Sequence, residues 1–262
     1  MIFQTFEARL GRFLFAGAWL LLGLESLALG IPVMRLESLP PGTTMTLVLS
    51  YATGIVVFLA ALGLMWAERA KLSGTVFAVL TLLWTLTLHL TKLLPTISRG
   101  DHWSGFGECF AVFGASWVLA AMMPPHLQIN LWDRIIAAGI PYGRACFGVA
   151  LLIFGAMHFV YHDFTANFIP SWIPERLFLA YFTGAAHIAA GLAILSGIFA
   201  RLGATLAGIM YASWVLLLHI PRVIAAPADS FEWNGVFVAS ILSASAFIMA
   251  ATFIKRDEGG KV

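Results

Sequence analysis

A few ionisable side chains inside long apolar segments are the residues of this chain that could do chemistry. His158 and His162 are four residues apart, so they share one face of a helix, and His187 lies in the next apolar segment. Glu25 lies deep in the first apolar segment. Ionisable groups are costly in apolar surroundings and mark candidate functional sites. We predict that His187, His158 and Glu25 are catalytic, because an acid and a histidine can relay protons near neutral pH.

The histidine pair has other interpretations. His158 and His162 could hold a metal ion or a haem, but a metal site normally needs a third ligand at fixed spacing. A quinone needs an apolar slot with few polar groups. The sequence therefore favours a quinone over a metal or a haem as cofactor. In the structural alternative, His162 is solvated at the membrane surface and His158 is hydrogen-bonded to a neighbouring helix.

A histidine followed one turn later by a cation occurs twice. His89 precedes Lys92, and His219 precedes Arg222 about 130 residues further along the chain. These four residues are candidate cofactor-binding groups, because a symmetric pair of this kind could bind an anion or a carbonyl group. They also have a structural interpretation, since a basic side chain near a helix end can reach the lipid headgroups.

Eight apolar segments must position these side chains. A helix that spans a bilayer needs about 20 mostly apolar residues. The predicted spans are roughly 13–34, 44–66, 72–94, 105–123, 145–161, 176–200, 202–223 and 233–254. Hydrophobic residues make up 60% of the chain and charged residues 11%, which is typical of an all-α integral membrane protein. The small net charge of +2 argues against nucleic-acid binding.

The two halves of the chain repeat each other. Residues 51–54 and 181–184 share a Tyr-x-Thr-Gly motif, and Trp84 corresponds to Trp214. Four predicted spans fall in each half, and an even number gives both halves the same orientation. We therefore predict two parallel four-helix repeats at 1–123 and 142–255, with a cytoplasmic linker at 124–141 and a charged tail at 256–262.

Loop charges predict the orientation of the spans. Most Lys and Arg residues fall on the side of the two termini, which the positive-inside rule places in the cytoplasm. We predict a protein of the bacterial cytoplasmic membrane with both termini in the cytoplasm. Most of the candidate residues then lie toward the outer face.

Differences between the halves are a guide to function. His187 corresponds to Val57, and Glu25 corresponds to Met157, which is next to His158. A histidine where the other half has a valine is not required by the fold. If the halves pack around a two-fold axis, we predict that Glu25 and His158 face one cavity.

Glycine motifs in the second half resemble those of a known family. They lie along two predicted helices. The first carries Gly143-Arg144, Gly148, Gly155 and His158, and the second carries Thr183 to Ala193 and then Gly197 to Leu202. Over residues 143–223 the pattern resembles the DoxX-like family of four-helix membrane proteins. The resemblance implies a fused tandem of two four-helix units. Some members are associated with thiosulfate:quinone oxidation, which implies a redox role here. The family often carries an acidic residue at the position of His187.

Two functions fit these observations. The first is a redox-associated integral membrane protein, or a subunit of one, that binds a quinone-like molecule near the outer face and meets a redox partner protein. The alternative is a non-enzymatic carrier or binding protein for a lipid or a small solute. The lipid bilayer is a partner in both cases, and a homo-oligomer is compatible with both.

Overall fold

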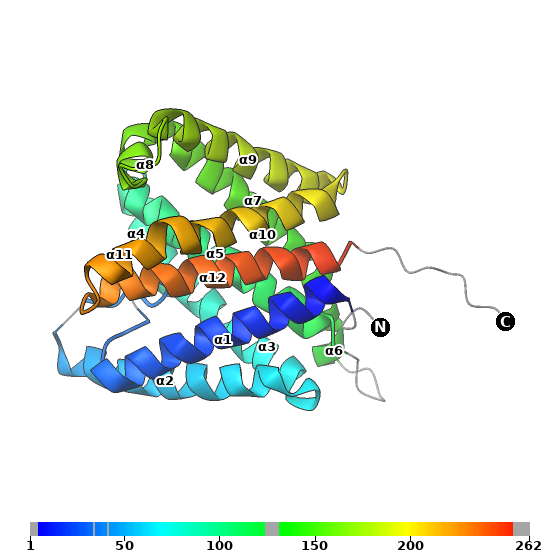
Figure 1. The fold of residues 1–262 in the computed structure, drawn as a ribbon. Coiled ribbons are helices and arrows are strands. Elements are labelled where there is room, and N and C mark those ends of the chain that lie inside the picture. Colours follow the sequence, from blue (N-terminus) through cyan, green and yellow to red (C-terminus); the bar gives the residue numbers. More distant parts are fainter. Residues whose placement is uncertain (1–4, 34, 41, 124–130, 254–262) are drawn as a thin grey trace.

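The computed structural model describes residues 5–33, 35–40, 42–123 and 131–253, and within these ranges it contains helices and no strand (Figure 1). Eight helical segments are long and apolar enough to cross a membrane. They are α1 (Phe6–Leu29); α2 (Thr44–Met65); α3 (Ala67–Trp84), continued by a π-helical turn (Thr85–His89), α4 (Leu90–Leu93) and a 3₁₀ turn (Leu94–Thr96); α5 (Gly100–Ala121); α6 (Leu131–Ala137) with α7 (Gly139–Val160); α9 (Arg176–Ser196); α10 (Ala200–Trp214), continued by a π-helical turn (Val215–His219) and α11 (Ile220–Ala225); and α12 (Ser230–Ala251). A short helix, α8 (His162–Phe168), follows α7. The eight apolar segments indicate an integral membrane protein.

Glycines end two helices earlier than the sequence predicts. α1 ends at Leu29 rather than near Met34, because Gly30 adopts a left-handed conformation with φ of 65° and caps the helix. α9 ends at Ser196 rather than Ala200, because Gly197 has φ of 78° and plays the same part. Glycine takes this conformation without the penalty that a Cβ would impose.

The segment predicted as a linker, 124–141, is helical in its second half. Residues 124–130 lie outside the described residues, and α6 follows from Leu131. α7 begins at Gly139, which places Pro141 in its first turn. Proline is tolerated there because the first N–H groups of a helix have no partner within it.

The eight segments form a closed arrangement around two central helices. α1 packs on α2 and α12, α3 on α2 and α5, α7 on α5 and α9, and α10 on α9 and α12. α5 and α12 also contact each other. The most apolar stretch of α12 is 89% buried and that of α5 is 67% buried, against 33–44% in the other segments. α5 and α12 are therefore the core of the bundle.

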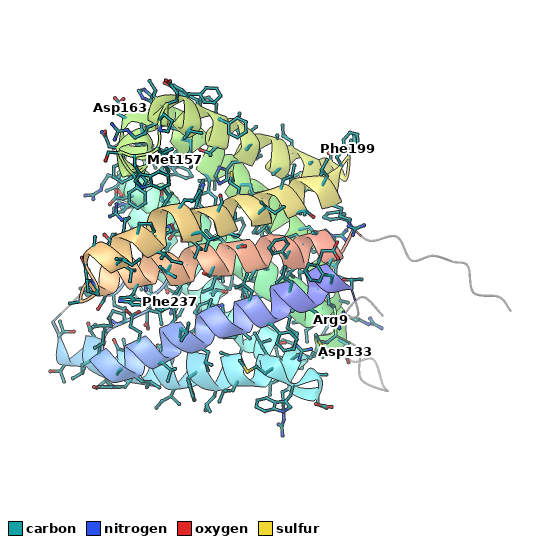
Figure 2. All side chains as sticks on the ribbon, viewed as in Figure 1. Arg9, Asp133, Met157, Asp163, Phe199 and Phe237 are labelled. Carbon is teal, nitrogen blue, oxygen red and sulfur yellow. The ribbon has the colours of Figure 1, made fainter. Side chains whose placement is uncertain are left out.

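The bundle has two ends that differ in the elements they carry. The start of α1, the α2–α3 turn, α6, the α9–α10 turn and the end of α12 lie at one end, called here the α6 end (Figure 1). The α1–α2 connection, α4, α8 and α11 lie at the other, called here the α8 end. Figure 2 shows Arg9 and Asp133 at the α6 end and Asp163 at the α8 end.

Glycines bring α7 and α9 into close contact. A Cβ on Gly155 would lie 2.8 Å from the carbonyl oxygen of Gly184, and one on Gly191 would lie 2.8 Å from that of Gly148. Neither distance leaves room for a side chain, so the two backbones touch at these positions. Small residues allow helices to approach in this way in membranes. These glycines belong to the pattern that resembles the DoxX-like family. They set the distance between α7, which carries His158, and α9, which carries His187.

Candidate functional site

Five aromatic side chains from α7, α9 and α10 form a cluster, called here the histidine cluster: Phe154, His158, His187, Tyr211 and Trp214. The His158 and His187 ring centroids are 4.9 Å apart. The ring of His158 stacks on Trp214 at 5.9 Å, and His187 lies 5.5 Å from both Tyr211 and Trp214. The structure therefore brings together two of the three residues predicted to be catalytic.

Backbone carbonyls determine which nitrogen of each histidine carries the proton. His187 Nδ1 is 2.8 Å from the Thr183 carbonyl, and His158 Nδ1 is 2.8 Å from that of Phe154. A carbonyl can only accept, so each Nδ1 must donate. His187 Nε2 then accepts from the Tyr211 hydroxyl at 3.0 Å. His158 Nε2 is an acceptor with no hydrogen-bond partner among the described residues, which leaves it available to a ligand.

Glu25 lies away from the histidine cluster. It is half-buried on α1, which packs on α2 and α12, whereas His158 is on α7, which packs on α5 and α9. Glu25 makes no hydrogen bond or ion pair with any described residue. No contact supports the predicted shared cavity for Glu25 and His158. Equal depth in two spans did not determine which helices would be neighbours.

His162 lies at the α8 end, on the surface. Its ring packs on Tyr181 at 5.3 Å, and its Nδ1 is 3.0 Å from the carboxylate of Asp163. Across the residues that the structure describes, no three His, Cys, Asp or Glu side chains are grouped to hold a metal ion. Among the described residues, therefore, no third side chain of these types joins His158 and His162 as a metal ligand.

The first repeated cation motif holds the α1–α2 connection in place. His89 is 4% exposed, and its Nε2 donates to the Leu36 carbonyl at 2.9 Å. Lys92 Nζ donates to the Ser38 hydroxyl at 2.7 Å and also to the Ser38 carbonyl. These contacts favour a structural role for His89 and Lys92.

The second motif contacts the α8 segment through ring packing instead of hydrogen bonds. The ring of Phe168 lies edge-on to His219 at 6.0 Å and 4.2 Å from the Arg222 guanidinium. Arg222 also makes two hydrogen bonds of 2.7 Å to the Glu232 carboxylate. Both motifs thus support the segment that follows the first span of their half, and neither set of contacts requires a cofactor.

Sequence reasoning missed an ion pair within the first half, whose arginine also contacts the second half through Asn234. Arg35 Nη2 donates to Glu108 Oε1 at 2.8 Å, and the Arg35 backbone N–H donates to Asn234 Oδ1 at 3.3 Å. Glu108 is 8% exposed and Asn234 is fully buried. The comparison that singled out His187 would have found Glu108 as well, because its counterpart in the second half is Val238.

A second buried carboxylate, Glu37, lies in the α1–α2 connection. It is 3% exposed, and its oxygens accept hydrogen bonds from the Thr53 hydroxyl at 2.7 Å and the Val33 N–H at 3.2 Å. Burial raises the pKa of Glu37 above its ordinary value of 4.5, although the two hydrogen bonds oppose this. Thr53, the threonine of the Tyr-x-Thr-Gly motif in the first half, therefore holds the α1–α2 connection against α2 through Glu37.

The raised pKa of Glu37 predicts a dependence of stability on pH. A carboxyl whose pKa is higher in the folded state contributes stability that is fully present below the unfolded pKa, 4.5, and is lost as pH rises through the folded value. We expect the melting temperature in detergent to fall over this window in the wild-type protein and to fall less in Glu37→Gln. Glu68→Gln, at an exposed position, is the control and should follow the wild type. Identical pH profiles for wild type and Glu37→Gln would contradict the prediction.

A long groove runs between α9 and α10, beside the histidine cluster. Its volume is about 940 Å³, and nearly all of its lining is apolar. Ile169 and Ile173 line it near the α8 end, and Ile198 and Phe199 line it at the α9–α10 turn. Phe182, Leu192, Leu202 and Leu206, which border it, are each more than half exposed, so the groove opens toward the surrounding lipid.

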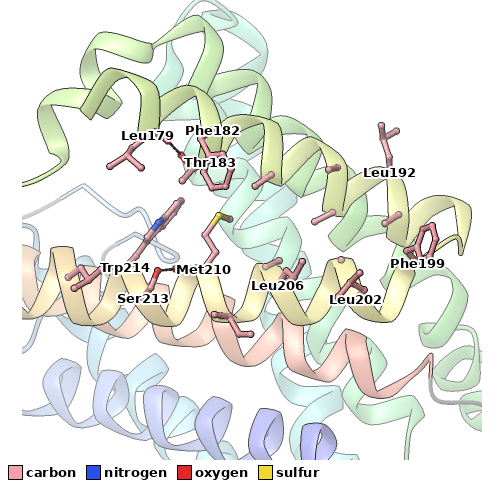
Figure 3. A pocket seen from close by; sticks show the side chains of 18 of the residues that line it. Leu179, Phe182, Thr183, Leu192, Phe199, Leu202, Leu206, Met210, Ser213 and Trp214 are labelled. Carbon is pink, nitrogen blue, oxygen red and sulfur yellow. Dashed lines mark hydrogen bonds between the residues drawn. The ribbon is translucent and has the colours of Figure 1, made fainter. Parts of the chain in front are cut away.

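Trp214 joins the groove to the histidine cluster. Figure 3 shows its indole extending from α10 toward Leu179 and Thr183 on α9. The indole ring packs with the rings of His158 and His187. Its Nε1–H has no hydrogen-bond partner among the described residues. The Thr183 hydroxyl donates to the Leu179 carbonyl at 2.7 Å and can still accept. The groove therefore combines an apolar channel with one unused donor.

Residues 147–249 match the model of a family described as "Domain of unknown function (DUF8561)". The match extends from α7 into α12, and so includes the histidine cluster and the groove. It covers less than half of the chain. No curated protein and no solved structure matches this chain. The similarity to the DoxX-like family remains a prediction from the motifs.

Proposed function

We propose that this protein binds a quinone-like lipid in the α9–α10 groove, as a redox-associated integral membrane protein or a subunit of one. The groove is the observation that carries the proposal. α9 has 21 residues, so the groove runs along about 30 Å of helix, enough for an extended isoprenoid chain. Ligand sites of this kind are apolar with a few placed polar groups.

The chemistry of the groove near Trp214 fits a quinone ring. Trp214 Nε1–H is a donor for a carbonyl oxygen, and His158 Nε2, in the adjoining cluster, is an acceptor for a hydroxyl. A quinone supplies two-electron redox chemistry when bound. In this proposal Trp214 orients the head of the ligand, and the apolar groove excludes water along its tail.

The proposal includes the arrangement of the chain as two parallel four-helix repeats. In support, the first span of each half packs on the last span of the other half: α1 packs on α12, and α7 packs on α5. Each half also has a π-helical turn that begins after its shared tryptophan and ends at its shared histidine. The indoles of Trp103 and Trp233 also donate to carbonyls six residues earlier, at 2.8 and 2.9 Å.

The orientation follows from charge. Arg9, Arg69, Lys71, Arg134 and Arg201 lie at the α6 end. The positive-inside rule places that end, and with it both termini, in the cytoplasm of a bacterial cell. Trp214 and the histidine cluster then lie toward the outer leaflet, where the quinone head would bind.

A lipid carrier or binding protein without redox activity is the alternative. It is favoured by the same groove, which opens to the membrane along its length and would accept an acyl chain. Organic extraction of the purified protein and mass spectrometry separates the two. A co-purified isoprenoid quinone supports the first proposal. Bulk phospholipid alone, with no binding in a quinone titration, would overturn it in favour of the carrier.

A substitution that fills the groove tests whether it is the site. Ala186 lines the groove, and its neighbour Ala185 is exposed and does not. We expect Ala186→Phe to weaken binding of a quinone with an isoprenoid tail at least about tenfold, or 1.4 kcal/mol, because the ring occupies the space of the tail. Ala185→Phe adds the same ring on another face and should bind like the wild type. Equal affinities for the two variants would place the site elsewhere.

A further inference from the structure

A second hollow lies at the α6 end of the bundle, where the α9–α10 turn meets the start of α1. Its volume is about 570 Å³, and it is called here the Arg201 pocket. Its charged and hydroxyl groups come from Glu7 on α1 and from Arg201 and Thr205 on α10. Phe199 and Leu202 line both this pocket and the α9–α10 groove, so the two cavities share a border.

The polar groups of the Arg201 pocket have unused hydrogen-bonding capacity. Arg201 Nη2 donates to Glu7 Oε1, and the other guanidinium N–H groups have no partner among the described residues. Glu7 Oε2 accepts no hydrogen bond from any other described residue. The Thr205 hydroxyl also has no partner in the described part of the chain. The pocket therefore offers donors on two side chains and one carboxylate acceptor.

The first half has an equivalent ion pair that is closed. Lys71 and Thr75 correspond to Arg201 and Thr205. Lys71 pairs with Asp133 on α6, and these two side chains are 15% and 3% exposed, against 53% and 16% for the two members of the Arg201 ion pair. The Thr75 hydroxyl donates to the Lys71 carbonyl at 2.9 Å. Only the second half thus leaves these groups open, so the pocket is not required by the repeat.

Exposed apolar side chains beside the pocket match the boundary between acyl chains and headgroups. Ile198, Phe199 and Leu202 are 67%, 76% and 55% exposed. Figure 3 shows Phe199 at the α9–α10 turn and Leu202 nearby on α10. Arginine suits this boundary, because its stem packs on apolar surface while its charged head stays in water. Basic pockets between spans on the cytoplasmic side are typical sites for lipid headgroups.

The charges of the pocket select one kind of head. Phosphate oxygens only accept hydrogen bonds, and they match the free donors of Arg201 and Thr205. A primary ammonium group only donates, and it matches the carboxylate of Glu7. A purely anionic head would place its charge beside that carboxylate with nothing to compensate it. A choline head has no N–H to donate.

We propose that the Arg201 pocket binds the head of a zwitterionic phospholipid that carries a primary ammonium group. Arg201 and Thr205 bind the phosphate, Glu7 binds the ammonium, and the acyl chains enter the bilayer past Leu202. This site lies at the α6 end, whereas the proposed quinone head binds near Trp214, toward the other end of the groove. The lipid site does not rest on the proposed function.

Titration of the delipidated protein with phosphatidylethanolamine in detergent, followed by native mass spectrometry, tests the donors. We expect Arg201→Gln to bind this lipid at least about tenfold more weakly than the wild type, because a charge-assisted contact to phosphate is lost. Thr205→Val, which leaves the ion pair intact, should weaken binding in the same direction. Arg69→Gln removes an exposed cation of the α6 end that does not line the pocket, and should bind like the wild type. Equal affinities of the wild type and Arg201→Gln would overturn the site.

The preference among headgroups tests the role of Glu7. The wild type should bind phosphatidylethanolamine more tightly than phosphatidylglycerol or phosphatidylcholine. Glu7→Gln should lose the preference over phosphatidylglycerol, and Glu68→Gln, at an exposed position of the same end, should keep it. Phosphatidylglycerol bound by the wild type at least as tightly as phosphatidylethanolamine would overturn the zwitterionic head. Soluble glycerophosphoethanolamine bound as tightly as the lipid would overturn a lipid as the ligand. Failure of quinone binding would overturn the proposed function and leave these measurements unaffected.

Discussion

Replacing Arg35 with alanine is expected to lower the free energy of unfolding by about 3–5 kcal/mol, because it leaves the buried carboxylate of Glu108 without its cation. Glu108 lies on α5, one of the two central helices, and Arg35 reaches it from the α1–α2 connection. The same substitution removes no hydrogen bond from Asn234, which binds the Arg35 backbone. It also removes the contact of the Arg35 guanidinium with the Phe231 ring, 5.8 Å from the ring centre, so the ion pair is isolated by comparison with a double variant. Reversible unfolding in detergent, followed by circular dichroism, measures the change in free energy.

The control for this prediction is an ion pair of the same type at the surface. Arg99 and Asp101 form a two-point contact at the α8 end, with both side chains about 60% exposed. We expect Arg99→Ala to leave unfolding unchanged within error, because exposed pairs contribute little. The double variant Arg35→Ala/Glu108→Leu should recover much of the loss, since it removes the stranded charge. Equal effects of Arg35→Ala and Arg99→Ala would show that Glu108 does not depend on its partner.

Replacing His187 with valine, the residue at the corresponding position of the first half, is expected to cost about 1–3 kcal/mol of unfolding free energy. The Tyr211 hydroxyl is buried and would lose its acceptor. The double variant His187→Val/Tyr211→Phe removes both members of the hydrogen bond and should be more stable than His187→Val alone. A double-mutant cycle in detergent measures the coupling between the two residues. Strict additivity would mean that the hydrogen bond contributes nothing.

Ligand binding by the same variants separates structure from function. Unchanged affinity for quinone in the double variant would assign the Tyr211–His187 pair to the scaffold. Affinity lost in the double variant, although its stability is recovered, would assign the pair to the site.

The helices could be predicted from the sequence, because apolar length is a local property. His158 and His187 were both recognised as candidate residues, but their contact was not predicted, since it depends on how α7 and α9 pack. The neighbours of Glu25 could not be predicted, since depth along a span does not determine which helix it faces. Its proposed partner, His158, lies on α7. The main neighbours of α7 are α5 and α9, whereas those of α1 are α2 and α12. Two helices end earlier than predicted because Gly30 and Gly197, which follow them, take the left-handed conformation.

The groove and the Arg35–Glu108 pair had no local signal. The groove exists because α9 and α10 separate between their turn at the α6 end and Trp214, and no residue pattern in either helix specifies that separation. Arg35 was visible as a loop residue, and Glu108 as an acid in an apolar segment. The 2.8 Å contact between them depends on the α1–α2 connection folding back into the bundle.

The position of α12 has a consequence for biogenesis. A chain is synthesised from its amino terminus, so the most buried helix of this bundle leaves the ribosome after the other seven apolar segments described here. Until then α1, α5 and α10 lack the surface on which they pack, and the faces they later bury against α12 meet lipid or a chaperone. Insertion of α12 therefore closes the bundle. A ribosome stalled before α12 would leave the other seven apolar segments with α5 as their one central helix, an open form that exposes the faces of α1, α5 and α10 to membrane quality control.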